Sequence, residues 1–176
     1  MYIKKCDMEN LLDCVKFYVK EVKYLEENVN YPRWESGIYP CEQTVVEKIE
    51  KGEQYIAYIG PFVGGAFVFN EDPAGDYSAG EWKQNLKKGE YAVIHTLAVN
   101  HSFYGRGYAK EMVNYCIDLA KKLGYKSIRV DVVPDNYPAR SLYEGMGFTF
   151  AGDKDLGRAF DNIPTFCLYE FDLTKN

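Results

Sequence analysis

Residues 95–109 read HTLAVNHSFYGRGYA, and they open the part of the chain that decides the fold. A strand is expected over Tyr91–Val99, a turn containing Gly105 and Gly107 follows, and a helix is expected over Tyr108–Leu123. The first backbone N–H groups of a helix lack partners within it, and the helix dipole adds partial positive charge there. Glycine allows backbone angles and a close approach that a Cβ would prevent. The stretch therefore predicts a phosphate-binding turn.

This turn does not match two common nucleotide-binding motifs. A P-loop requires Gly-Lys followed by Ser or Thr, whereas Lys110 lies between Ala109 and Glu111. The dinucleotide-binding fingerprint requires a third glycine at the position of Lys110. Two glycines alone are equally typical of an ordinary helix entry, so another part of the chain has to indicate the ligand.

That indication comes from residues 135–148, which read DNYPARSLYEGMGF. They resemble the Asn-x-x-Ala-x-x-Leu-Tyr-x-x-x-Gly-Phe segment of the GCN5-related N-acetyltransferase (GNAT) family. Residues 104–109 are similar to the Arg/Gln-x-x-Gly-x-Gly/Ala loop with which that family binds the pyrophosphate of coenzyme A, and they depart from it at Tyr104. The departure is expected to change packing more than binding, because backbone N–H groups make most of the contact in that loop.

The resemblance implies a fold and a set of ligand contacts. The fold is a single N-acetyltransferase domain over residues 1–176, of the α/β class, with a mixed, mostly antiparallel sheet of about seven strands flanked by about four helices. The implied cofactor is acetyl-CoA, the acyl donor. The residues implied to contact it are Leu97, Ala98, Val99, Tyr104, Gly105, Arg106, Gly107, Tyr108, Ala109, Lys110, Asn136, Ala139 and Tyr143.

Tyr143 is the first catalytic candidate, because the resemblance places its hydroxyl close to the coenzyme sulfur. A tyrosine with a pKa of about 10 can protonate a thiol with a pKa of about 8.5 only through a positioned hydrogen bond. Without the resemblance, Tyr143 would be typical of a core tyrosine with a satisfied hydroxyl. Asn136 is expected in either case to cap the helix that starts near Pro138.

His95 is the second catalytic candidate. Its side chain shares a strand face with Tyr91, Val93 and Leu97, which is typical of a core histidine. A neutral imidazole could instead take the proton that an ammonium group must lose before attack, directly or through water. The sequence leaves both interpretations open.

Two loops supply the candidate acceptor-binding residues. Trp34, Glu35 and Tyr39 lie in residues 28–40, and Trp82 lies in a polar excursion over residues 71–89. Charged loops are usually only solvated, yet tryptophan, tyrosine and carboxylates together also suit a cation. A small, positively charged or polar amine is expected to bind between these loops.

Composition limits the other possibilities. With 21 basic against 26 acidic residues, a net charge of -5 and a pI near 5.2, the chain is not typical of a nucleic-acid-binding protein. The five cysteines are scattered without a Cys-x-x-Cys pair, so we expect buried free thiols, a reducing compartment and no metal site. The chain shows neither a signal peptide nor the run of roughly 18 apolar residues that spans a bilayer. A cytoplasmic protein without membrane partners is expected, and a homodimer is left open.

Helix and strand patterns predict the remaining elements. They are a strand over residues 2–6, a helix over 8–27 capped by Asp7, a helix over 42–51 ended by Gly52, a hairpin of strands over 54–60 and 62–70, a strand over 126–133, a helix over 138–146, and strands over 148–151 and 165–173. The expected buried stripe of the first helix is Leu11, Val15, Tyr18, Val19 and Val22.

The function expected from these patterns is acetyl-CoA-dependent transfer of an acetyl group to a primary amine of a small molecule, directly within a ternary complex. Two alternatives remain: acetylation of a protein N-terminus or lysine, and a non-catalytic acyl-CoA-binding module. The presence of Tyr143 favours an enzyme over a binding module.

Overall fold

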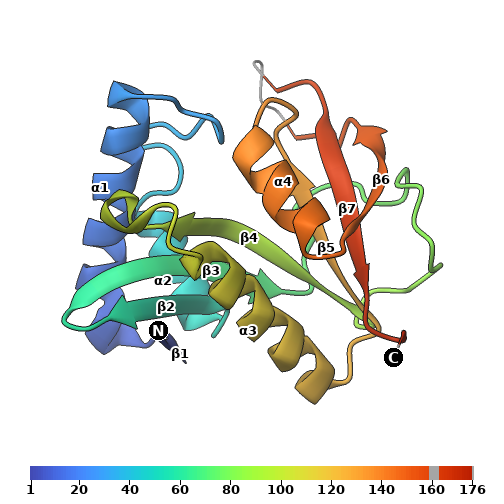
Figure 1. Cartoon of the computed structure of the whole chain (residues 1–176), viewed down its shortest axis with the longest axis horizontal. Helices are drawn as coiled ribbons and strands as arrows, with labels where there is room; N and C mark the ends of the chain where they lie inside the picture. Colours follow the sequence, from blue (N-terminus) through green and yellow to red (C-terminus); the bar gives the residue numbers. More distant parts are fainter. Residues whose placement is uncertain (159–162, 176) are drawn as a thin grey trace. The chain divides into compact units, whose positions relative to one another are not determined.

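The computed structural model describes residues 1–158 and 163–175 (Figure 1). Its strands are β1 (Tyr2–Lys5), β2 (Gln54–Ile59), β3 (Phe62–Asn70), β4 (Tyr91–Val99), β5 (Ser127–Val132), β6 (Thr149–Lys154) and β7 (Phe166–Asp172). Its α-helices are α1 (Leu11–Glu27), α2 (Glu42–Glu50), α3 (Tyr108–Leu123) and α4 (Tyr137–Gly145), with 3-10 turns η1 (Met8–Asn10) and η2 (His101–Phe103).

The seven strands form one mixed sheet in the order β1-β2-β3-β4-β5-β7-β6. The pairs β1–β2, β2–β3, β5–β7 and β6–β7 are antiparallel, whereas β4 and β5 run parallel. The predicted α/β fold with about seven strands and about four helices is therefore confirmed.

The chain divides into two compact units. Unit 1 comprises Met1–Phe69 and His95–Tyr115, and unit 2 comprises Asn70–Ile94 and Cys116–Asn176. Strand β4 and helix α3 each contribute residues to both units. The single N-acetyltransferase domain over residues 1–176 stays a prediction.

In unit 1, the predicted buried stripe of helix α1 is confirmed except at Val19, since Leu11 and Val15 also pack against the core. Tyr18 and Val22 are buried as expected, but Val19 is 57% exposed, and the face is completed by Cys14 and Phe17. The buried face is centred on Tyr18 and Val22 and extends towards Cys14 and Phe17, so Val19 lies beyond its edge. The buried face also contains a carboxylate, Glu21.

The start of α1 differs from the prediction, whereas α2 starts at Glu42 as predicted. Asp7 caps η1, where its Oδ1 accepts the Glu9 N–H at 3.0 Å, and α1 begins three residues later than expected, at Leu11. Four of the five cysteines are buried free thiols, but Cys41 is half-buried. It starts α2, where Thr44 Oγ1 accepts the Cys41 N–H at 2.9 Å.

In unit 2, aromatic and charged side chains fix the excursion before β4. Residues 71–89 form neither helix nor strand, as predicted. Arg129 on β5 forms a buried ion pair with Glu170 on β7 at 3.0 Å. Its guanidinium lies 4.1 Å from the centre of the Trp82 ring and 4.2 Å from that of Tyr91. The excursion is thereby attached to the sheet through Trp82.

Candidate active site

Strand β4 contains a strained residue at its centre. Its parallel pairing with β5 covers Tyr91, Ala92 and Val93. Thr96 then has a φ of 46°. A β-branched residue with positive φ is a true outlier, and such strain costs roughly 1–3 kcal/mol and persists only where neighbouring groups impose it.

Tyr18 on α1 holds this strained residue. Its hydroxyl donates to the Thr96 carbonyl oxygen at 3.0 Å and also lies 3.3 Å from Thr96 Oγ1, while Gln54 Nε2 lies 3.4 Å from the same hydroxyl. Burial raises the pKa of Tyr18 well above its usual value, so that the phenol stays protonated and can donate. The strained backbone at Thr96 is thus held by a contact between residues 78 positions apart in the sequence.

We expect Tyr18→Phe to lower the free energy of unfolding by about 1–3 kcal/mol, because it leaves a part-buried carbonyl without its donor. Urea unfolding measures the change. Tyr58→Phe is the matched control, since it removes an exposed hydrogen bond to Asp13 Oδ2 at 3.1 Å and should change stability by within about 0.5 kcal/mol. Equal losses in the two variants would contradict the assigned role of Tyr18.

The turn between β4 and α3 contains two glycines with positive φ and open space around them. Gly105 and Gly107 have φ values of 73° and 83°, and nothing lies within 4 Å of a Cβ built on either residue. The Glu111 N–H donates to the Gly107 carbonyl at 3.2 Å, so the first helical hydrogen bond starts at Gly107. The N–H groups preceding Glu111 in α3 therefore have no acceptor within the helix and can serve an anion.

Tyr104 lies before these glycines and packs against α1. Its side chain is 50% exposed and meets Tyr24 edge-on, with 6.1 Å between ring centres. Burial, followed by the charge of Glu21 and by Tyr24, raises the pKa of Tyr104 to about 12. The predicted contact of Tyr104 with the cofactor stays a prediction.

In unit 2, helix α4 presents Tyr143. The predicted cap is confirmed, since Asn136 Oδ1 accepts the Ala139 N–H at 3.2 Å. After the other end of α4, Gly147 has a φ of 90° and reverses the chain direction. The Phe148 N–H then donates to the Tyr143 carbonyl oxygen at 3.0 Å. The Tyr143 ring then packs edge-on against Phe148 at 5.1 Å.

The Tyr143 side chain is buried, and its hydroxyl stays protonated near neutral pH. The residue is 6% exposed, and burial is the main cause that raises the pKa of Tyr143 well above its usual value, with Cys116 and Asp131 adding to it. In the part of the chain that the structure describes, the hydroxyl forms no hydrogen bond. A protonated, uncommitted phenol can act as an acid and cannot act as a base near neutral pH.

The other predicted residues occupy varied surroundings. His95 is half-buried on β4, and Leu97, Ala98 and Val99 follow it on the same half-buried segment. Trp34 packs against the core of unit 1, with its ring centre 6.1 Å from that of Tyr18.

Glu35 and Tyr39 are exposed in the turn that follows Trp34, where the Tyr39 N–H donates to the Glu35 carbonyl at 3.0 Å. In unit 2, Trp82 Nε1 donates to the Tyr77 carbonyl at 2.6 Å, and the ring is committed to packing. A substrate contact of Trp82 stays a prediction.

Each unit therefore assembles part of the predicted set. Unit 1 holds His95, residues 97–99, the turn 104–110 and the aromatic loop, whereas unit 2 holds Asn136, Ala139, Tyr143 and Trp82. Sequence reasoning missed Tyr18, Thr96 and the pair Glu21 and His101. Only Glu21 gave a signal, as a carboxylate at the spacing of the buried stripe of α1.

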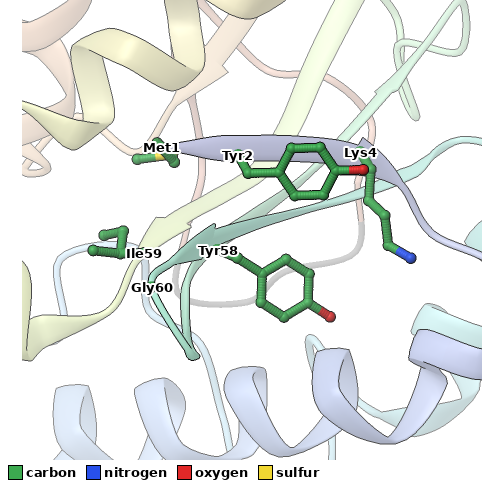
Figure 2. A pocket seen from close by; sticks show the side chains of 6 residues that line it. All are labelled: Met1, Tyr2, Lys4, Tyr58, Ile59 and Gly60. Carbon is green, nitrogen blue, oxygen red and sulfur yellow. The ribbon is translucent and has the colours of Figure 1, made fainter.

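A hollow of about 590 Å³ lies away from these residues (Figure 2). It is lined by Met1, Tyr2 and Lys4 of the β1 region and by Tyr58, Ile59 and Gly60 at the end of β2. None of the predicted site residues lines it.

Within residues 1–158 and 163–175, no three His, Cys, Asp or Glu side chains are arranged to hold a metal ion. A search of the same residues finds no helix with the length and apolar character needed to cross a membrane.

Comparison with known proteins identifies the family. YvbK of Bacillus subtilis (strain 168), an uncharacterized N-acetyltransferase, is 30% identical over 110 residues, which are 62% of this chain and 61% of that protein. The chain spans less than two thirds of the length of the curated relatives it matches.

Two solved structures share the fold. A GNAT-family acetyltransferase of Streptococcus agalactiae 2603 has a TM-score of 0.77 at 16% identity, covering 99% of this chain and 96% of that one. The yncA structure from Salmonella typhimurium, solved with its cofactor acetyl-CoA, has a TM-score of 0.70 at 14% identity, covering 100% and 95%. A sequence model described as "Acetyltransferase (GNAT) family" matches residues 7–148, and the chain belongs to this family.

Proposed function

We propose that residues 1–176 form a single N-acetyltransferase domain that uses acetyl-CoA to acetylate a primary amine of a small molecule. The observation that carries the proposal is the turn at Gly105 and Gly107, two open glycines with positive φ at the start of the sixteen-residue helix α3. Family membership and the acetyl-CoA in the yncA structure support the choice of ligand.

The residues of the turn suit a diphosphate. The N–H groups at the start of α3 and the N-terminal end of the helix dipole would hold the phosphates, and the side chain of Lys110 is exposed in the same first turn. The backbone of Leu97, Ala98 and Val99 would pair with the pantetheine arm, to which Asn136 and Ala139 also contribute. When bound, acetyl-CoA supplies an acetyl group activated as a thioester.

The protein's own groups would then manage two protons. Tyr143 donates its hydroxyl proton to the departing sulfur, which its raised pKa permits only through direct contact. The amine must lose a proton before it attacks, and His95 is the candidate base, directly or through water. No covalent enzyme intermediate is needed, so transfer occurs within a ternary complex.

The acceptor is a small, positively charged or polar amine that contacts the loop of Trp34, Glu35 and Tyr39. Glu35 is exposed in this loop, and Trp34 contributes an indole beside it. An exposed carboxylate next to aromatic rings attracts an ammonium group through charge and cation–π contact. The net charge of -5 favours the approach of a cation.

We expect Glu35→Gln to raise KM for the best cationic acceptor by up to about fivefold at low salt, since an exposed charge pair contributes up to about 1 kcal/mol. The difference should shrink at physiological ionic strength, where charges are screened over about 8 Å. Steady-state kinetics across salt, with Glu50→Gln on α2 as an exposed control, measure the effect. An unchanged KM in Glu35→Gln at every salt concentration would place the acceptor elsewhere.

The reaction itself is tested by following coenzyme A release with a panel of small amines, peptides with free N-termini and lysine peptides. Turnover with small amines alone supports the proposal. Turnover restricted to peptides would show that the acceptor is a protein amine and not a small molecule. Tight acetyl-CoA binding without any turnover would indicate a binding module.

A further inference from the structure

Helix α1 buries a charged side chain next to the proposed phosphate turn. Glu21 is 1% exposed and lies in the apolar face that also contains Tyr18 and Val22. A carboxylate removed from water is strongly unfavourable unless donors compensate it. The partners of Glu21 therefore indicate what the charge is used for.

Both partner groups belong to His101, the first residue of η2. The His101 backbone N–H donates to Glu21 Oε2 at 2.9 Å, and His101 Nδ1 lies 3.1 Å from each carboxylate oxygen. The backbone and the ring of one residue are thus fixed by the same carboxylate. Tyr24, one turn further along α1, stacks on the imidazole with ring centres 4.0 Å apart and 4° between the planes.

Asn100 fastens the same turn to β3. Its backbone N–H donates to the Gly64 carbonyl at 2.9 Å, and its Nδ2 donates to the Val63 carbonyl at 2.9 Å. Its Oδ1 accepts the Ser102 N–H at 3.0 Å. The first half of the β4–α3 connection is therefore held from two sides, and the exposed glycines follow directly after it.

We propose that Glu21 and His101 are positioning residues for coenzyme A, because together they hold residues 101–104 in the arrangement from which the start of α3 receives the pyrophosphate. This inference rests on the proposed function. Neither residue needs to touch the coenzyme. Glu21 supplies the buried anchor, and His101 connects the anchor to the turn.

The negative charge of Glu21 makes the pair unusual so close to a proposed anion site. A carboxylate near a diphosphate site repels the ligand, and the charge of Glu21 does reach Tyr104, four residues before Tyr108. His101 compensates the buried carboxylate through its backbone N–H and its ring. His101→Ala would therefore leave the buried carboxylate of Glu21 with the backbone N–H as its one remaining donor, which is worse than removing both side chains.

Calorimetric titration with acetyl-CoA tests the pair. Glu21→Gln should raise Kd roughly 3- to 10-fold, because only a fraction of the molecules would keep the turn in its binding arrangement. The turnover number at saturating acetyl-CoA should stay the same, so the effect appears in KM for acetyl-CoA. Glu27→Gln, an exposed carboxylate on the same helix, is the control and should leave Kd unchanged.

The double variant separates positioning from general damage. His101→Ala should weaken binding more than Glu21→Gln, and Glu21→Gln/His101→Ala should bind more tightly than His101→Ala alone. A double variant that binds more weakly than His101→Ala, or a Glu21→Gln protein with wild-type Kd, would overturn the inference. Wild-type protein that does not bind acetyl-CoA would instead overturn the proposed function, so the two failures are distinguishable.

Discussion

Tyr143→Phe lowers the turnover number by roughly 10²- to 10⁴-fold while the affinity for acetyl-CoA stays within about twofold of wild type, the result expected for the loss of a general acid. The ring still packs against Phe148, so the fold loses little. Because the pKa of Tyr143 is raised far above neutrality, the phenol is protonated throughout the usable pH range. The pH–rate profile of the wild type should consequently show no loss of activity from Tyr143 between about pH 6 and 9.

Tyr137→Phe is the matched control for this variant. Tyr137 is the first residue of the same helix, and its side chain is 60% exposed. Its loss should leave turnover unchanged. Wild-type turnover in Tyr143→Phe, measured with an active acceptor, would instead give Tyr143 a structural role only.

Gly107→Glu removes measurable binding of acetyl-CoA. A side chain at this position lies beside the N–H groups at the start of α3, and a carboxylate there adds negative charge where the diphosphate must bind. The φ of 83° also strains any residue other than glycine, at a cost of about 1–2 kcal/mol. Calorimetry detects the loss of binding, and thermal unfolding records the strain.

Gly124→Glu separates the two effects. Gly124 follows the other end of α3, has the same φ of 83°, and likewise has nothing within 4 Å of a Cβ. The Gly124→Glu variant therefore has a similar backbone strain at a position away from the proposed phosphate turn. If Gly107→Glu loses acetyl-CoA binding and Gly124→Glu retains it, the turn is supported as the pyrophosphate site. Equal affinity of both variants for acetyl-CoA would contradict this assignment.

Local features of the sequence predicted much of the fold. Strand Tyr91–Val99 and helix Tyr108–Leu123 were given with their observed bounds, because strand composition and helical spacing depend on neighbouring residues only. The cap at Asn136 follows from the same short-range chemistry. The buried stripe of α1 was wrong only at Val19, because the buried face extends to the other side, towards Cys14 and Phe17.

The contacts that shape the candidate site are not local. The Tyr18 hydroxyl reaches Thr96 across 78 positions, and Glu21 reaches His101 across 80. A threonine in a strand gives no sign of a positive φ, since β-branched residues are typical of regular strands. The carboxylate of Glu21 at a buried helical position was a visible sign, but its partner could be found only in the folded chain. The roles of His95, Trp34 and Trp82 stay predictions.

The proposed function is tested most directly by supplying acetyl-CoA with an isotopically labelled acetyl group and locating the label by mass spectrometry after incubation with small amines. Direct transfer in a ternary complex predicts a labelled N-acetyl product, with one coenzyme A released per acetyl group. The enzyme should carry no covalently attached label at any time. An acetyl label covalently attached to the protein during turnover would contradict direct transfer. Bound but unconsumed acetyl-CoA with every amine would contradict the enzyme itself.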